Sequence, residues 1–306
     1  MKDKEQEADK LMRKAQKLLQ PSVLSLRIKP DRERALPLFE QAVNLFKQCD
    51  ATDKARVASE RAAECQNAAG SGWHAAKHLE TAAALALEMG DSEGAIRLYS
   101  EAADLYFGVG RLPAGAMALC NGGKALQQQN PGQASALFNK ALDTITQNDE
   151  RGTSAPDIFR QVIGHELKQE NWEEAAGLLL KFGAFCEEKK MAASQNRCYL
   201  GAVVVWLHAM DGRQAWLTFQ DCISIASFAN SEEGRAADRL IDAYRNDSAD
   251  EIKQVIKKNA CFQFLETPVG RLAVKLPNGD VGPVAKGLGS AEGGSAEEDL
   301  EDPDLT

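Results

Sequence analysis

The sequence has few of the features that mark membrane spans, secreted domains or metal-binding modules. No run of eighteen apolar residues occurs, so we expect no membrane-spanning helix. The seven cysteines are never closer than twelve positions apart and form no CxxC pair, which argues against a disulfide framework. The first residues are charged, and no secretory leader is visible. We therefore expect a cytoplasmic protein in a reducing compartment.

Motifs of nucleotide binding and catalysis are also missing. There is no GxxxxGK(S/T) phosphate loop, and the glycines of Gly108-Val-Gly110 follow a helical pattern rather than a strand. His74 and His78 are four apart on one predicted helix face, but no third ligand completes a zinc site. Three other polar residues are isolated in the sequence, and we interpret them as surface or satisfied core residues: His165, Glu166 and His208. We expect no enzymatic activity, metal, cofactor or small-molecule substrate.

Positive charge is scarce overall and unevenly placed. The net charge is −9, of which residues 1–30 contribute +4, residues 31–276 contribute −6 and residues 277–306 contribute −7. A globally acidic chain is a poor candidate for nucleic-acid binding, so we expect no nucleic-acid partner. The final segment has almost nothing to bury, which predicts a disordered acidic tail over residues 277–306.

One helical pattern is abundant and recurs along most of the chain. Small or apolar residues stand at offsets 0, 3, 4, 7, 10 and 11, and the pattern begins again roughly every twenty residues. These offsets trace one stripe of an α-helix. Two clear copies are Ala35, Leu38, Phe39, Ala42, Leu45 and Phe46, and then Ala95, Leu98, Tyr99, Ala102, Leu105 and Tyr106. A short helix cannot bury its stripe alone, so successive helices must stack.

The recurrence predicts the fold class and the domain boundaries. Two helices per hairpin make a unit of about forty residues, which is longer than a tetratricopeptide repeat. We predict an all-α fold: a right-handed α-solenoid of antiparallel helix hairpins over 1–230, a small C-terminal helical bundle over 231–276, and the acidic tail over 277–306. Turn signals fall between the predicted helices, and four residues there are expected to cap the next helix: Asp91, Asn130, Asn171 and Asp211.

Two segments depart from the repeat. Residues 21–30 are bounded by prolines that stop helix propagation, and apolar and basic residues are interleaved between them. Such a segment either folds back on the first hairpin or touches a membrane, where basic residues meet anionic headgroups. The candidates for that contact are Val23, Leu24, Leu26, Arg27 and Lys29. In the tail, a leucine embedded among acids suits docking on a basic groove: Glu297, Glu298, Asp299 and Leu300.

An ordered set of short motifs resembles one protein family over about residues 5–265. The set comprises Lys14-Ala15-Gln16-Lys17-Leu18-Leu19, Lys29-Pro30-Asp31, His74-Ala75-Ala76-Lys77, Gly90-Asp91, the copy from Ala95 to Tyr106, Gly110-Arg111, Ala116-Met117-Ala118-Leu119, Gly123-Lys124 and Asn130-Pro131. Together with the twenty-residue register, it resembles the soluble attachment proteins for the N-ethylmaleimide-sensitive fusion ATPase (NSF), and most closely their gamma form.

The resemblance implies a mechanical adaptor. Members of this family line a SNARE four-helix bundle with concave, partly basic faces, and their C-terminal ends recruit the hexameric AAA+ ATPase NSF, which pulls the bundle apart after membrane fusion. The resemblance implies that Arg111 contacts the bundle, that residues 297–300 bind the ATPase, and that the protein associates peripherally with membranes. Arg97 and Lys124 are added as bundle contacts from periodicity alone.

Two departures from the family pattern affect the expected strength of binding to the bundle. Met117 stands where other forms carry a SNARE-binding lysine, and Pro156-Asp157 replaces another basic site. The departures predict either weaker binding to the SNARE bundle or binding to a different set of SNAREs.

Two other function classes fit the same fold. A generic helical-repeat scaffold or co-chaperone would bind peptide termini, usually through lysines and asparagines that line a short-period groove, and the longer unit here argues against it. An enzyme with an active site among the helices is the third reading, and no motif with catalytic spacing supports it.

Overall fold

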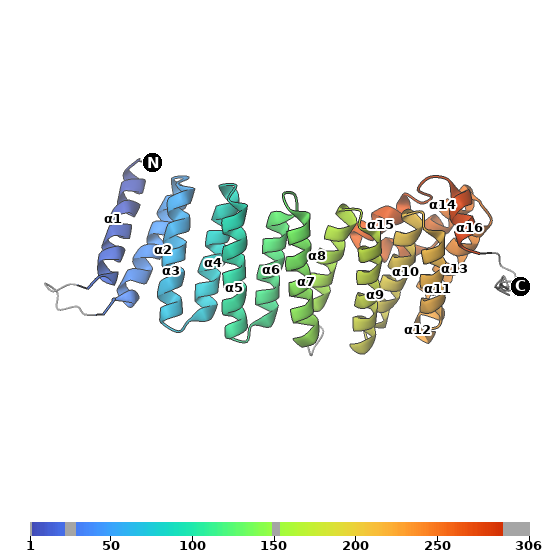
Figure 1. Ribbon diagram of the computed structural model, residues 1–306, viewed down its shortest axis with the longest axis horizontal. Helices are drawn as coiled ribbons and strands as arrows, with labels where there is room; N and C mark the ends of the chain where they lie inside the picture. Colours follow the sequence, from blue (N-terminus) through green and yellow to red (C-terminus); the bar gives the residue numbers. More distant parts are fainter. Residues whose placement is uncertain (1, 22–28, 149–153, 290–306) are drawn as a thin grey trace, which may run out of the picture. The chain divides into compact units, whose positions relative to one another are not determined.

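The computed structural model describes residues 2–21, 29–148 and 154–289. Over these ranges the chain is helical apart from short connections, and no strand occurs in them, so the predicted all-α class is confirmed (Figure 1). The helices form two compact units, residues 1–170 and residues 171–306. Each unit is described by itself.

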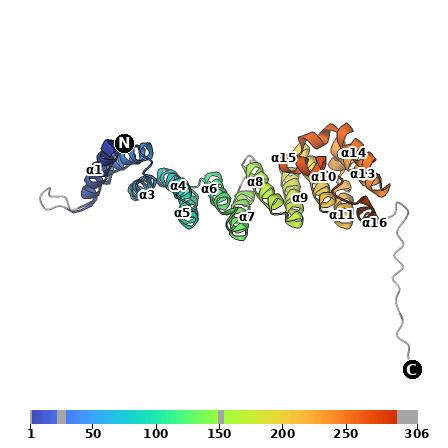
Figure 2. The same ribbon diagram turned by 90° about the horizontal axis from the view of Figure 1, so that it is seen from above.

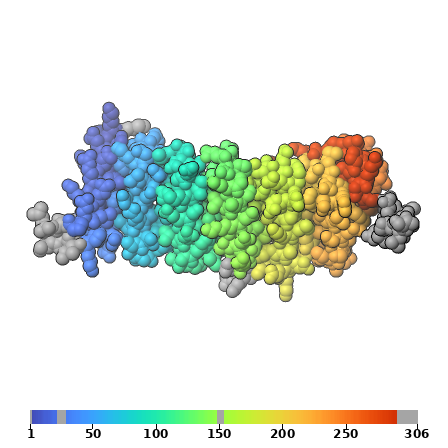
Figure 3. Space-filling model, in the orientation of Figure 1, coloured from blue at the N-terminus to red at the C-terminus, as the bar shows by residue number. Residues whose placement is uncertain are grey.

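The first unit is a stack of helices in chain order. Each helix packs most extensively against its immediate neighbours in the chain, and in the space-filling view the colours follow one another as bands for this reason (Figure 3). This arrangement is the α-solenoid that the repeat predicts. Its helices are α1 (Lys2–Leu19), α2 (Arg32–Gln48), α3 (Thr52–Ala68), α4 (Gly72–Glu88), α5 (Ser92–Gly108), α6 (Leu112–Leu126), α7 (Pro131–Asn148) and α8 (Ala155–Lys168).

Polar side chains also join helices that are two apart in this stack. Lys54 Nζ of α3 lies 2.8 Å from Glu5 Oε1 of α1. His78 Nε2 of α4 lies 3.3 Å from Glu40 Oε1 of α2. Alternate helices, α1 with α3 and α2 with α4, therefore also contact each other. Such contacts are expected where stacked antiparallel hairpins form two layers.

The twenty-residue period has a backbone cause. Helices α2 to α5 each have 17 residues and are joined by links of three residues. In each link the N–H of the third residue returns to a carbonyl five residues earlier, as Asp91 N does to Ala86 O at 2.9 Å. This is a Schellman motif, which needs a left-handed residue in the middle. The middle residues of these three links and of four later ones are Asp50 (φ 55°), Gly70 (79°), Gly90 (77°), Gly110 (70°), Glu170 (58°), Lys190 (59°) and Met210 (62°).

Four of these left-handed positions hold residues other than glycine, and they offer a test of the motif. The left-handed conformation costs a residue that has a Cβ about 1–2 kcal/mol. Lys190→Gly is therefore expected to raise the free energy of unfolding by about 1 kcal/mol. Lys189→Gly is the matched control, because the neighbouring residue has a φ of −88° and should lose stability instead. Urea denaturation measures both changes, and the same sign for both would contradict the motif.

The second unit is organised around one buried helix. Its elements are α9 (Trp172–Glu188), α10 (Ala192–His208), α11 (Gly212–Ile223), α12 (Ala226–Ala229), α13 (Glu232–Arg245), α14 (Ala249–Lys258), the 3-10 helix η1 (Ala260–Phe264), α15 (Thr267–Val274) and α16 (Val281–Gly287). Helix α10 contacts α9, α11, α12, α13 and α15. Figure 2 labels four of these beside α10, namely α9, α11, α13 and α15. The run Val203–Val205 of α10 is fully buried, as expected for a stretch of helix that other helices cover on all sides.

The C-terminal boundaries differ from those expected. The compact units divide between residues 170 and 171 rather than at 230, because α13 packs on α10 and α11 and joins them in one unit. Residues 277–289 are not a disordered tail: they include α16, which packs on α11 and α13 and buries Val281, Val284 and Leu288. The sequence hides this element because its few apolar residues lie among glycines and a proline. Residues 290–306 lie outside the described residues.

Candidate functional site

Arg111 lies in the link between α5 and α6, with its backbone fixed at both ends. Its N–H donates to Tyr106 O at 2.8 Å, and its carbonyl accepts from Gly115 N at 3.1 Å. The side chain is exposed and makes no capping hydrogen bond. Within the residues that the structure describes, its guanidinium has no ion pair. The link therefore holds an uncompensated cation on a rigid backbone.

Lys124 lies near the other end of α6. Its side chain is exposed, and it too has no ion pair in the described part of the chain. Thirteen residues separate it from Arg111, which corresponds to about 20 Å along a helix axis. The structure therefore places these two predicted residues at opposite ends of one helix rather than in one cluster.

Arg97 of α5 is in a different electrostatic setting. Its guanidinium lies 2.9 Å from Glu101 Oε1 and 3.8 Å from Glu60 Oε2 of α3. These residues line a groove of about 420 Å³ together with Glu64 and Asp104. Glu60 and Glu64 also pair with Arg56 and Arg61, so the carboxylates and guanidiniums here largely neutralise one another. Arg97 therefore does not present a free positive charge to an acidic partner.

The two departures from the family pattern are integrated into α6 and α8. The sulfur of Met117 accepts from Gln161 Nε2 at 3.4 Å, so this residue takes part in the contact between the two helices. Asp157 Oδ1 lies 2.8 Å from Arg160 Nη1 one turn further along α8. A basic side chain is therefore present beside the altered site, but a carboxylate holds it.

The histidine pair considered for zinc has other partners. His74 Nδ1 lies 2.7 Å from Ser71 Oγ, while His78 faces Glu40 of α2. Burial lowers the pKa of His78, and the nearby carboxylate of Glu40 opposes that shift. Among the described residues, no group of three or more His, Cys, Asp or Glu side chains is placed to hold a metal ion.

A buried polar network joins α7 and α8, which sequence reasoning did not identify. Gln127 Nε2 donates to His165 Nδ1 at 2.9 Å, and His165 Nε2 lies 3.2 Å from Ser135 Oγ. Ser135 Oγ donates to Glu166 Oε1 at 2.8 Å. His165 and Glu166 are almost completely buried, so the network satisfies two polar groups that would otherwise be costly. The repeat contained the signal, because these residues stand at offsets 10 and 11 of the copy that begins at Ala155.

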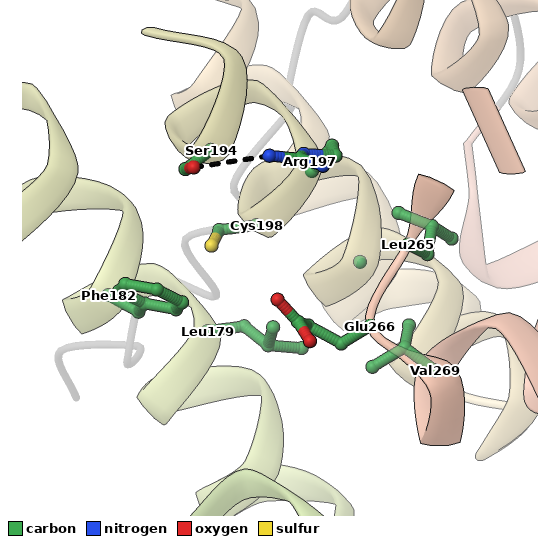
Figure 4. A pocket seen from close by; sticks show the side chains of 9 residues that line it. Leu179, Phe182, Ser194, Arg197, Cys198, Leu265, Glu266 and Val269 are labelled. Carbon is green, nitrogen blue, oxygen red and sulfur yellow. Dashed lines mark hydrogen bonds between the residues drawn. The ribbon is translucent and has the colours of Figure 1, made fainter. Parts of the chain in front are cut away.

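A small cavity in the second unit lies between α9, α10 and α15 (Figure 4). Its volume is about 10 Å³, enough for at most one water molecule. Arg197 Nη2 at its margin donates to Ser194 Oγ at 3.2 Å. The pKa of the Cys198 thiol is raised by its hydrogen bond with Cys186 and by burial. A protonated thiol beside so small a cavity serves packing rather than nucleophilic chemistry.

The remaining predicted residues lie at the edges of the described ranges or beyond them. Lys29 is exposed just before α2, whereas Val23, Leu24, Leu26 and Arg27 lie outside the described residues. Glu297, Glu298, Asp299 and Leu300 also lie outside them. None of the described helices has both the length and the apolar character needed to cross a bilayer.

Comparison with known proteins decides the family. The sequence model described as "Soluble NSF attachment protein, SNAP" matches residues 6–265. The chain belongs to the soluble NSF attachment protein family. This SNAP-family chain is 33% identical to the gamma-soluble NSF attachment protein of Arabidopsis thaliana over 298 residues, which cover 97% of the chain and 98% of that relative. It is 25% identical to the gamma-soluble NSF attachment protein of Dictyostelium discoideum over 274 residues, covering 90% and 83%. The resemblance seen in the motifs is confirmed.

Proposed function

We propose that this chain is an adaptor that binds assembled SNARE bundles and recruits and stimulates the ATPase NSF, which disassembles them. The observation that carries the proposal is membership of the soluble NSF attachment protein family over residues 6–265. The relatives' names state attachment to NSF. Stacked helices suit the role, because each presents a fixed surface along which a long partner can lie.

The geometry ranks the residues proposed to contact the bundle. Arg111 and Lys124 are exposed and have no compensating carboxylate in the described part of the chain. Arg97 is held by Glu60 and Glu101. An acidic coiled-coil bundle would be attracted more strongly to exposed cations that no carboxylate already pairs with. The proposal therefore rests on Arg111 and Lys124 rather than on Arg97.

The proposal includes peripheral contact with a membrane surface through residues 21–30. The exposed side chain of Lys29 suits this contact, because basic residues beside a bilayer are attracted to anionic headgroups. The apolar candidates of the segment, Val23, Leu24 and Leu26, remain predictions.

Arg111→Glu should weaken binding to a purified SNARE bundle about fivefold to tenfold, because reversal of one exposed charge is worth roughly 1 kcal/mol. Arg111→Lys is the matched control and should keep most of the affinity, since it retains the charge. Circular dichroism should show the same helical content for both variants. Unchanged binding by Arg111→Glu in a quantitative pull-down would remove this residue from the interface.

The whole proposal is tested by a pull-down from cytosol and membranes depleted of ATP. We expect the chain to retain a AAA+ hexamer together with coiled-coil membrane proteins, and to release them when ATP and magnesium are added. The scaffold reading predicts a different result, namely binding of an EEVD-type peptide measured by fluorescence. Binding of that peptide without retention of the hexamer would overturn the adaptor assignment.

A further inference from the structure

A large groove in the second unit is formed by α14, η1 and α15. Its volume is about 810 Å³, and its apolar lining includes Ile256, Phe262 and Leu276. Val274, which also lines it, has a side chain that is 78% exposed. Exposed apolar surface of this kind in a folded unit marks a site of interaction.

Four cations surround this apolar lining without compensation. Lys253, Lys257, Arg271 and Lys275 all line the groove, and no acidic side chain does. None of the four has an ion pair within the ranges that the structure describes. Lys253 and Lys257 are four apart on α14, and Arg271 and Lys275 are four apart at α15. Like charges at this spacing repel each other, so a bound anion would relieve both pairs.

We propose that this groove binds the chain's own C-terminal segment, residues 290–306. That segment contains seven acidic residues and no lysine or arginine, and it carries two leucines, Leu300 and Leu305. A leucine flanked by acids on both sides complements a groove in which cations surround an apolar lining. The proposal places Leu300 against the apolar lining and the acids of residues 297–302 against the four cations.

The segment starts in the same unit as the groove and has the length to reach it. Leu288, at the end of α16, is buried, and its carbonyl accepts from Arg245 Nη2 at 3.2 Å. Eleven residues separate Gly289 from Leu300, a reach of about 36 Å when extended. A folded unit of about 120 residues has a radius of gyration of roughly 14 Å and so a diameter of about 36 Å, which this reach matches. Tethering gives an effective concentration on the order of millimolar, so even a weak contact would be largely formed.

The contact would withhold the tail from other partners. The same residues, Glu297 to Leu300, cannot occupy the groove and an ATPase at once. This consequence, unlike the contact itself, rests on the proposed function. The chain would then expose its tail only when a stronger basic surface competes for it.

Photo-crosslinking of the full chain tests the contact without NSF or SNAREs, so the result is independent of the proposed function. Leu300→p-benzoylphenylalanine is introduced, the purified protein is irradiated at low concentration and low salt, and cross-linked peptides are mapped by mass spectrometry. We expect cross-links from position 300 to residues 253–276 in the monomeric product. Lys257→Glu combined with Arg271→Glu should lower their yield at least fivefold.

Lys257→Glu alone should also lower the yield, and its matched control is Lys258→Glu, which makes the same charge change one residue further along α14. Lys258 does not line this groove and instead donates to Gln254 Oε1 at 3.2 Å. It should keep the yield, and thermal melting should be the same for both sets of variants. Cross-links that map outside the groove, that join two copies, or that persist unchanged in the double variant would overturn the proposal. So would binding of phosphatidylserine vesicles that requires Lys257 and Arg271 when the cross-link is absent, since the groove would then be a lipid site.

Discussion

Phe138→Ala should lower the free energy of unfolding of the first unit by about 3–5 kcal/mol. Phe138 is completely buried at the centre of α7, and its ring lies 4.9 Å from the ring of His165 on α8. On the other side it packs on α6 at Gly123, where an added Cβ would come within 3.0 Å of the ring. Truncation therefore leaves a cavity between three helices and removes the contact that supports the buried network.

The loss is measured by urea denaturation, with hydrogen exchange of α7 and α8 to assign it to this part of the chain. Phe264→Ala is the control, because that ring is 64% exposed and its truncation should change stability little. A loss below 1 kcal/mol for Phe138→Ala would contradict the packing of α6, α7 and α8 described above.

Deleting residues 291–306 should lower stimulation of the ATPase at least tenfold and leave SNARE binding unchanged. This expectation rests on the proposed recruitment of NSF and on the sequence prediction that the acids and leucine of residues 297–300 bind a basic surface of the ATPase. Burial of one leucine side chain contributes about 1.5–3 kcal/mol, so Leu300→Ala alone should cause about a tenfold loss. The control is Glu292→Gln, which changes an acid outside that string. Equal stimulation by the truncated chain would show that the tail takes no part.

The helices could be predicted because their signal is local. The stripe that begins at Ala95 is buried at Ala95, Leu98, Tyr99, Ala102 and Tyr106. The expected caps Asp91, Asn130 and Asp211 each accept a hydrogen bond from a backbone N–H three residues on, at 2.9, 3.2 and 2.9 Å. Asn171 occupies the expected capping position but makes no side-chain capping bond. Burial and capping at these positions follow from helix geometry within one helix and its link.

Features that depend on other helices could not be read from the chain. Arg97 was expected to contact the bundle, and its guanidinium pairs with Glu101 one turn further along α5 and, at 3.8 Å, with Glu60, which only the packing of α3 brings near it. The four groove cations meet only because η1 turns α15 back towards α14, and no sequence spacing between Lys257 and Arg271 indicates this. Charge balance at a surface is partly a tertiary property, so sequence periodicity alone does not show which candidate cations have a carboxylate partner on another helix.

The three-residue links also constrain how such a chain can change its length. Inserting one residue inside a helix would rotate everything beyond it by about 100° and advance it by 1.5 Å. The apolar stripe of the next helix would then no longer face the helix on which it packs. Removing a single helix with its link would reverse the direction of every later helix. Gain or loss of whole hairpins, about forty residues at a time, is the change that keeps the apolar stripes of all remaining neighbouring helices packed on each other.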